Sequence, residues 1–346
     1  MSTRRGRIRI TGFDPNRVDD RERLSDWVDD TGGDVASRHS QIWRRFKRNR
    51  TAMLGLAVVM IMVVLAVLSR PITIWGIPVQ PISLAPYDPA AHLALNPDVM
   101  AGNYESPSAD HPFGTDNENR DLFSRILYGG RYSISIGFVV VALTLSVGIV
   151  VGSVAAYYGG WVDEITMRLL DVIFAFPNLI LALVLVAMLG GSYWTLVLAF
   201  SIFGWAPYAR MIRGEILSVK QEEYVLAAKA LGARDRRVIF RHVVPNAIPP
   251  VIVQATLSLA TVVIGVAALG FLGVGLDPGT AEWGSMLSDM QDSIMPGPGA
   301  PIPWWATVVP GAAIFLFVMS INMIGDGIND ALDTHSMDAQ PIDGGT

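Results

Sequence analysis

The chain has 346 residues, of which 51% are hydrophobic and 16% are charged. Soluble domains carry charges on about a quarter of their residues, so this composition excludes an ordinary soluble protein and predicts an integral membrane protein. The chain contains no cysteine, and its five histidines are scattered along the sequence. Disulfides and thiolate metal sites are therefore excluded, and no metal site is predicted.

The N-terminal part predicts a cytoplasmic tail followed by a first membrane helix. Residues 1–37 are too hydrophilic to build a core, so we expect a partly disordered tail. Six Lys and Arg residues lie between positions 38 and 50, and the apolar run 52–68 follows at once. Because basic residues flank spans on the cytoplasmic side, segment 38–69 is predicted to enter the membrane from the cytoplasm.

A long polar loop is expected over residues 70–131. Before position 120 it contains six acidic residues against one Arg, which favours an extracytoplasmic location after the first span. Near its end, Leu122, Phe123, Ile126 and Leu127 would lie on one face of a helix. We therefore expect a short amphipathic helix at the membrane interface there.

The remaining sequence predicts five further spans in an all-α integral membrane fold. Loop 210–246 carries eight Lys and Arg residues and is placed in the cytoplasm, whereas loop 277–303 carries none and is placed outside. Both termini are then cytoplasmic, including a tail at 334–346. Pro177 and Pro207 are expected to kink their helices. The spans predicted within the core, residues 132–333, are 132–157, 165–189, 193–209, 247–276 and 304–325.

The cytoplasmic loop is expected to hold two short helices joined by a hinge. Glu222 to Leu231 is rich in strong helix formers, and Gly232 follows where a left-handed cap is needed. Asp235 is placed to cap the second helix, and Pro245 is placed to end it. On periodicity alone, an amphipathic helix-turn-helix lying on the lipid surface explains the loop equally well.

The spacing of small residues in this loop resembles a known motif. Ala227-Ala228, Gly232 and Pro245 resemble the EAA loop of ABC importer permeases. The sequence departs from that motif at Leu226, where the family has glutamate. It departs again at two positions near the end of the loop, His242 and Val244. These departures, with the Glu223-Tyr224 and Arg241-His242…Pro245-Asn246 pairs, resemble the dipeptide, oligopeptide and nickel branch of those permeases.

Other stretches resemble further segments of the same branch, in the same order along the chain. Together with the loop they cover residues 38–333. They are the basic run before the first span, His111 to Asp116, Arg120-Asp121, Ser124-Arg125, Arg131, Gly270 to Gly275, Trp283-Gly284, Asn322, Gly325-Asp326 and Ala331 to Asp333.

The resemblance implies the C-type permease subunit of a type I ABC importer in the cytoplasmic membrane. It implies membrane lipid and a set of protein partners: a homologous second permease, two ABC ATPases and an extracytoplasmic binding protein. No nucleic acid is expected. The implied activity is import of di- or oligopeptides by alternating access, with nickel and oligosaccharides as alternative cargoes. In the family the loop docks into a cleft on the ATPase, and the positions expected to do so here are Glu222, Glu223, Tyr224, Ala227, Ala228, Gly232, Arg241, His242, Pro245 and Asn246.

The sequence also indicates where the energy for transport comes from. A phosphate-binding loop of the Walker type needs Gly-Lys, and this dipeptide never occurs in the chain. We therefore expect the chain itself to bind no cofactor, with ATP hydrolysed by a partner ATPase. The sequence also shows no Ser-His-Asp or metal-binding arrangement, so no catalytic residue is predicted.

The predicted membrane spans contain few ionisable residues. Segments 172–209, 247–276 and 304–325 contain no Asp, Glu, Lys, Arg or His. Proton-coupled carriers need ionisable groups within the membrane, so this class is disfavoured, while a sodium-coupled carrier or a channel acting alone stays open. Uncharged polar residues in or near the spans serve either helix–helix hydrogen bonding or a solute path. They are Ser133, Ser135, Thr144, Ser146, Asn178, Gln254, Thr256, Ser258 and Asn322.

Overall fold

A computed structural model describes residues 38–74, 77–89, 104–233, 235–277, 279–291 and 302–332. The tails predicted at 1–37 and 334–346 lie outside these residues. The chain divides into two units, Met1–Arg45 and Phe46–Thr346. Of the first unit only the beginning of helix α2 (Arg38–Arg48) is described, and this helix carries much of the basic run that precedes the first span.

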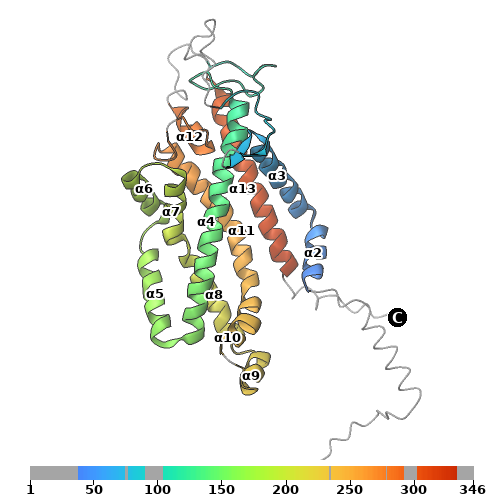
Figure 1. The fold of residues 1–346 in the computed structure, drawn as a ribbon, viewed down its shortest axis with the longest axis vertical. Coiled ribbons are helices and arrows are strands. Elements are labelled where there is room, and N and C mark those ends of the chain that lie inside the picture. Colours follow the sequence, from blue (N-terminus) through green and yellow to red (C-terminus); the bar gives the residue numbers. More distant parts are fainter. Residues whose placement is uncertain are drawn as a thin grey trace, which may run out of the picture. The chain divides into compact units, whose positions relative to one another are not determined.

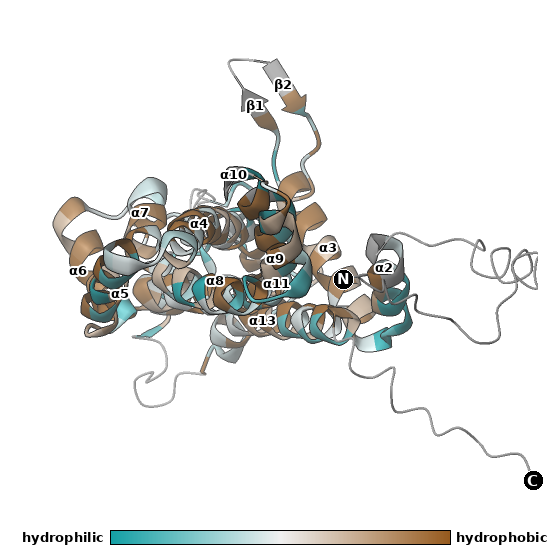
Figure 2. Cartoon of the chain, turned by 90° about the horizontal axis from the view of Figure 1, so that it is seen from below, coloured by the Kyte–Doolittle hydropathy of each residue, from teal (hydrophilic) through white to brown (hydrophobic). Residues whose placement is uncertain are grey.

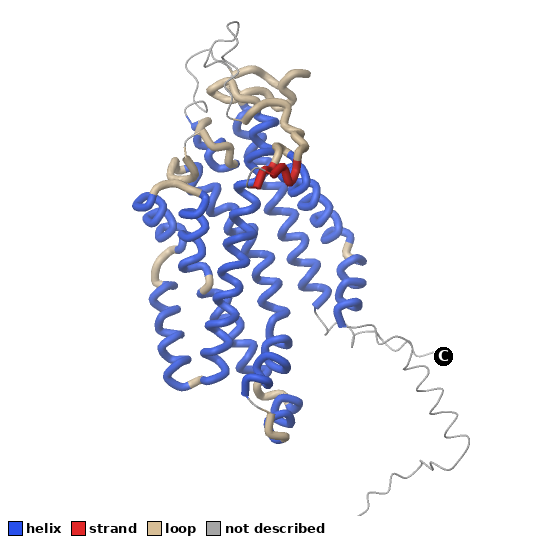
Figure 3. The backbone as a smooth tube through the Cα atoms, viewed as in Figure 1, coloured by secondary structure: helices blue, strands red, loops and turns tan. Residues whose placement is uncertain are grey.

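The second unit is built almost entirely of helices, which confirms the predicted all-α class (Figures 1 and 3). One short antiparallel hairpin was not anticipated: strands β1 (Ile72–Ile74) and β2 (Ile77–Gln80) pair in the loop after the first span. The helices are α3 (Arg50–Leu68), α4 (Leu122–Tyr158), α5 (Gly160–Phe174), α6 (Asn178–Leu189), α7 (Tyr193–Gly204), α8 (Ala206–Val219), α9 (Glu223–Ala230), α10 (Asp235–Val238), α11 (Val244–Phe271), α12 (Trp283–Ser288) and α13 (Trp304–Leu332).

Five helical segments are long and apolar enough to cross a membrane, and the bent pair α5–α6 makes a sixth if it counts as one span. The five are Arg50–Leu68, Leu122–Tyr158, Tyr193–Val219, Arg241–Phe271 and Trp304–Leu332. Large apolar side chains on these helices, such as Leu54 and Phe315, are exposed on the surface of the chain. Figure 2 shows this apolar colouring on α3 and α6, as expected for helices that face lipid or another membrane subunit.

The third predicted span is more strongly broken than the expected kink. Helices α5 and α6 meet at an angle of 77°. Pro177 lies at the N-cap of α6, where it has an extended backbone. Proline has no N–H to continue a helix and disfavours helical geometry in the residue before it, so the helix stops and restarts in a new direction.

The interfacial helix expected near residue 122 is not separate from the second span. The structure instead has one helix, α4, of 37 residues. Asp121 caps it by accepting a hydrogen bond from the Ser124 amide at 2.8 Å. No proline or strongly polar break follows, so the helix runs on. Its length of about 55 Å exceeds the ~30 Å hydrocarbon thickness, and α4 therefore extends well beyond the bilayer core.

Several helices also begin or end at residues other than those predicted. Helices α7 and α8 meet at Trp205, and α8 continues to Val219, ten residues into the predicted loop. Arg213 on this extension forms a bidentate ion pair with Asp163 of α5, with bonds of 2.5 and 2.6 Å. Helix α13 likewise continues through Asp326 and Asp330, which lie beyond the predicted end of the last span at residue 325. Helix α11 ends earlier than predicted, at Phe271.

Helix α4 lies at the centre of the unit and contacts α3, α7, α8 and α11. Two glycines one turn apart bring it against α8. A Cβ added at Gly148 would lie 2.5 Å from the Cβ of Tyr208, and one at Gly152 would lie 2.4 Å from the carbonyl oxygen of Ala209. Real Cβ contacts are never this short, so glycine sets the distance between these helices.

We predict that Gly152→Val destabilises the protein by about 1–3 kcal/mol, because the added methyl groups force α4 away from α8. The measurement is thermal unfolding of the purified protein in detergent. Gly214→Ala on α8 is the matched control, since a Cβ there meets nothing within 4 Å. Equal unfolding temperatures for the two variants would contradict this view of the contact.

Candidate functional site

The first candidate site is the segment of the predicted loop that lies beyond α8, at the lower end of the second unit in Figure 1. Helix α9 occupies Glu223–Ala230, close to the predicted limits. Its only buried residue is Val225. Val225 inserts into an apolar core cluster formed with α8, α10 and α11, which includes Ile212, Ile216 and Val251. One buried apolar side chain therefore packs α9 against the core of the second unit.

Gly232 ends this helix as predicted. Its φ angle is +80°, in the left-handed region where glycine carries no Cβ penalty. The Gly232 amide donates to the Lys229 carbonyl and the Ala233 amide donates to the Ala228 carbonyl, the pair of bonds of a Schellman cap. A Cβ at Gly232 would meet nothing within 4 Å. Within this chain, glycine is thus required by backbone conformation and not by crowding.

The expected end of the second helix at Pro245 is wrong. Residues 239–243 form a π-helical turn, and Pro245 is the second residue of α11, which continues without interruption. In the π turn the Val244 amide donates to the Ile239 carbonyl, five residues back. This wider spacing loosens the helix just where a proline would clash with an ordinary α-helical turn. The site residues Arg241 and His242 lie in this π turn.

The predicted site residues lie on or next to α9 and in the segment from the π turn to the start of α11. Leu231, next to Gly232, is 89% exposed, and Leu226 is 53% exposed. Both lie outside the candidate membrane spans. Exposed apolar side chains outside a membrane mark a contact surface for another protein. Of the predicted residues, Glu222, Glu223, Tyr224, Ala227, Gly232, Arg241, Pro245 and Asn246 are exposed, and Ala228 and His242 are half-buried.

Two lysines connect this surface to the end of α4. The Lys220 ammonium donates to the carbonyls of Ala156 and Tyr157 at 3.0 and 2.9 Å. The Lys229 ammonium lies 5.1 Å from the centre of the Tyr157 ring. Burial, followed by the nearby charge of Lys229, lowers the pKa of Lys220. Cations at a helix C-terminus satisfy its last carbonyls and complement its dipole, so α4 and the α9 segment are joined here.

The opposite end of the unit carries a buried ionic network. Arg120 donates to Asp116 at 2.7 Å and to Asp289 at 3.0 Å. Arg125 lies 3.3 Å from each of the same two carboxylates. His111 contacts Asp121 at 3.0 Å. The sequence identified the residues before α4 as a family motif, but their partner Asp289 was missed because it lies in a loop more than 160 residues away.

Glu282 is a further buried carboxylate at this end, and sequence reasoning also missed it. It is 1% exposed, and it accepts hydrogen bonds from the Ser133 hydroxyl at 2.8 Å and the Ser285 amide at 2.9 Å. Burial raises the pKa of the Glu282 carboxyl above its usual value, and these hydrogen bonds only partly oppose that effect. Glu282 thus holds the short helix α12 against α4.

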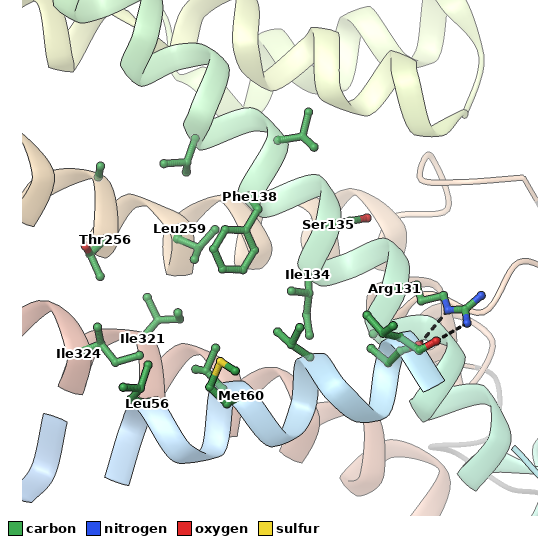
Figure 4. Close-up of a pocket in the computed structure, with 18 of the residues that line it drawn as sticks. Leu56, Met60, Arg131, Ile134, Ser135, Phe138, Thr256, Leu259, Ile321 and Ile324 are labelled. Carbon is green, nitrogen blue, oxygen red and sulfur yellow. Dashed lines mark hydrogen bonds between the residues drawn. The ribbon is translucent and has the colours of Figure 1, made fainter. Parts of the chain in front are cut away.

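Two cavities lie among the spanning helices, and their polar groups differ. The larger, of about 790 Å³, lies between α3, α4, α11 and α13 (Figure 4). Its few polar side chains are engaged with backbone. Arg131 turns onto the carbonyls of Ala66, Val67 and Arg70 at the end of α3, and Thr256 donates to the Ile252 carbonyl at 3.0 Å. Such a surface suits hydrocarbon.

The second cavity, of about 480 Å³, lies between α4, α6, α7, α8 and α11. Four of the nine uncharged polar residues singled out in the sequence meet in its wall: Thr144, Asn178, Gln254 and Ser258. The others include Ser133, which bonds to Glu282, and Ser146 and Thr256, which bond back to their own helices. Among the described residues, no three His, Asp or Glu side chains gather to hold a metal ion.

The helical fold and the sequence motifs agree with what comparison to known families shows. Residues 148–336 match the family described as the inner membrane component of binding-protein-dependent transport systems, and residues 37–107 match the N-terminal transmembrane domain of oligopeptide transport permease C. The chain belongs to this family. It is a multi-pass protein of the cytoplasmic membrane and a transporter component, as the loop motif predicted.

Two individual permeases and one solved transporter structure are similar to this chain. The chain is 37% identical to the dipeptide transport system permease protein DppC of Alkalihalophilus pseudofirmus, over 85% of this chain and 88% of that protein. It is 36% identical to the glutathione transport system permease protein GsiD of Escherichia coli O1:K1 / APEC, over 85% and 89% of the two chains. A solved structure of the MetNI methionine ABC transporter in inward-facing conformations has a TM-score of 0.46 and 16% identity, covering 59% of this chain and 96% of that chain.

We predict that Glu282→Gln changes how stability depends on pH. A carboxyl whose folded pKa is raised stabilises the fold below its unfolded pKa of about 4.5, and this contribution is lost as pH rises through the folded pKa. The variant cannot ionise, so it should gain stability relative to the native protein as the pH rises from about 4.5 through the raised pKa of Glu282. Unfolding temperatures of both proteins across this range test the prediction, and a constant difference would contradict it.

Proposed function

We propose that this chain is the membrane subunit of an ATP-driven importer of di- and oligopeptides. The observation that carries this proposal is the similarity to dipeptide and glutathione permeases over 85% of the chain. Both named cargoes are short compounds joined by amide bonds. The chain's own cargo is accordingly a short peptide, delivered by a binding protein to the end of the molecule that carries the ionic network of Arg120 and Asp289.

The proposed energy source is a pair of separate ATPase subunits that contact the α9 surface. This surface is formed by Glu222, Glu223, Tyr224, Ala227, Ala228, Gly232, Arg241, His242, Pro245 and Asn246. Eight of these ten residues are exposed. The exposed apolar side chains Leu226 and Leu231 lie next to them in the sequence, and the basic residues of the loop favour the cytoplasmic side. The sequence also lacks the Gly-Lys of a phosphate-binding loop, in keeping with ATP hydrolysis in another subunit.

In this proposal a homologous second permease completes the path, and the two subunits work by alternating access. ATP binding closes the ATPase pair and displaces α9. Because Val225 ties α9 to the cluster around Ile212 and Ile216, the displacement is passed to α8 and α11. The exposed apolar faces of the spanning helices provide surface for the second permease and for lipid.

Leu231→Glu tests the docking role of the α9 surface. Leu231 is 89% exposed, so a charge there leaves the fold intact. It should nevertheless reduce ATP-driven peptide uptake by about tenfold or more, because a carboxylate enters the apolar contact with the ATPase. Uptake is measured in proteoliposomes that contain all subunits. The control is Glu164→Gln, an exposed change near the α4–α5 turn at the same end of the molecule. Native uptake in Leu231→Glu would count against the docking role.

A second prediction concerns the isolated chain. We expect no stoichiometric ATP binding and no cargo uptake when this subunit alone is placed in vesicles, because the energy comes from its partners. Equilibrium binding of labelled ATP and a sodium-gradient uptake assay measure the two properties. Sodium-driven uptake by the chain alone would instead support a carrier, and uptake of nickel or oligosaccharides in place of peptides by the full complex would replace the proposed cargo.

A further inference from the structure

The smaller of the two membrane cavities combines features that a solute path requires. Its volume of about 480 Å³ lies within the ~300–1,000 Å³ range of small-ligand sites. Its wall includes the beginning of α6, which starts after the bend at Pro177, and parts of α7 and α8, which meet at Trp205. Residues that are distant in sequence, such as Asn178 and Gln254, thereby face the same space.

The wall of this cavity contains amide and hydroxyl groups but no Asp, Glu, Lys, Arg or His. An ionic group inside the membrane would bind one sign of charge strongly and exclude the other. Amides and hydroxyls instead both donate and accept hydrogen bonds. The wall therefore suits a solute rich in neutral donors and acceptors, and the backbone of a short peptide has this chemistry.

The Tyr208 hydroxyl is an independent observation that points to a polar ligand for this cavity. Tyr208 lines the cavity and is 2% exposed, yet its hydroxyl has no hydrogen-bond partner among the described residues. Thr144 and Ser258 are near enough to interact with it, but neither meets the geometry of a hydrogen bond. Leaving a buried hydroxyl unpaired is unfavourable, so a solute that completes the bond would be favoured.

The larger cavity serves as an internal comparison. Its polar groups are bonded to backbone carbonyls, as at Arg131 and Thr256, and the rest of its wall is apolar (Figure 4). In the smaller cavity the Thr144 hydroxyl likewise donates to the Val140 carbonyl at 2.8 Å, but the Gln254 amide donates to another side chain of the wall, the Ser258 hydroxyl, at 3.3 Å. Thr256 and Gln254 are two residues apart on α11, but they face different cavities. The same helix thus presents one face suited to hydrocarbon and another suited to a polar solute.

From these observations we infer that the cavity lined by Thr144, Asn178, Tyr208, Gln254 and Ser258 is the part of this subunit that contacts the cargo, and that it binds peptide backbone amides through neutral hydrogen bonds. The inference rests on the proposed peptide import and deepens it. The cavity gives the subunit no preference for the charge of peptide side chains, which leaves that selection to the binding protein.

Charge substitutions at Gln254 test the inference in the reconstituted transporter. Gln254→Glu should raise the uptake of a cationic tripeptide relative to an anionic one, and Gln254→Lys should do the opposite, each by about tenfold or more relative to the native protein. A residue that only supports the fold would lower both uptakes together. Thr256→Glu and Thr256→Lys are the controls on the same helix, and they should leave the ratio unchanged. An unchanged ratio in both Gln254 variants would overturn the inference.

Cysteine labelling keeps the test decisive if a charged variant fails to assemble, because the native chain has no cysteine. In the assembled transporter, Ser258→Cys should react with a charged, membrane-impermeant thiol reagent, and peptide present during turnover should slow the reaction. Thr256→Cys should react at least about tenfold more slowly, because a thiol in hydrocarbon stays protonated. Equal rates, or no protection by peptide, would overturn the inference.

The two proposals fail in different ways. If the native transporter takes up no peptide, peptide import is wrong, but the labelling of Ser258→Cys still reports whether a polar solute path lies here. If peptide uptake is normal while neither the Gln254 ratio nor Ser258 labelling responds as described, only the assignment of the cavity is wrong.

Discussion

Helices α4 and α8 approach each other at Gly148 and Gly152 so closely that a Cβ at either position would overlap the other helix. This contact fixes α8, and α8 connects the two regions to which we assign function. At one end Tyr208 faces the polar cavity, and further along Ile212 and Ile216 pack under α9 through Val225. Tyr208 belongs to the same buried cluster as Val225. A displacement of α9 therefore meets close-packed side chains all the way to the cavity wall.

The two ends of the helical unit are stabilised by different interactions. At one end Arg120 and Arg125 are buried against Asp116 and Asp289, and loss of one partner would leave a charge unpaired inside the protein. Burial also raises the pKa of Asp289, although the two arginines act in the opposite direction. At the other end α9 buries only Val225. A firmly held end at the ionic network and a lightly attached α9 suit the proposed displacement of α9 by a partner.

The sequence predicted those parts of the molecule that depend on local chemistry. Hydropathy located the apolar segments, and the small-residue pattern located α9 and its Gly232 cap, because each depends on neighbouring residues alone. Helix ends were less predictable. The extension of α8 to Val219 is stabilised by Arg213 and Asp163, which are 50 residues apart. Helix α11 includes Pro245 because a π turn precedes it, and no residue pattern predicted this π turn.

The candidate cavity shows the same limit. The sequence identified its polar residues only as members of a larger set, because periodicity does not reveal which helices become neighbours. The breaks at Pro177 and Trp205 bring Asn178 and Tyr208 into the wall of one cavity. The absence of charged residues from these spans then means that this wall is polar but neutral. The ten predicted docking residues, by contrast, lie within 25 positions of one another in the sequence. Contacts between distant segments are therefore not needed to place them at the same end of the second unit.

The most direct test asks whether a change at the α9 surface alters the cavity that contains Ser258. The rate of thiol labelling of Ser258→Cys is measured in the assembled transporter with and without ATP, in the native background and together with Leu231→Glu. The account predicts that ATP changes the labelling rate severalfold in the first background and leaves it unchanged in the second. An ATP-dependent change that persists in the presence of Leu231→Glu would show that the motion does not reach the cavity through the α9 surface.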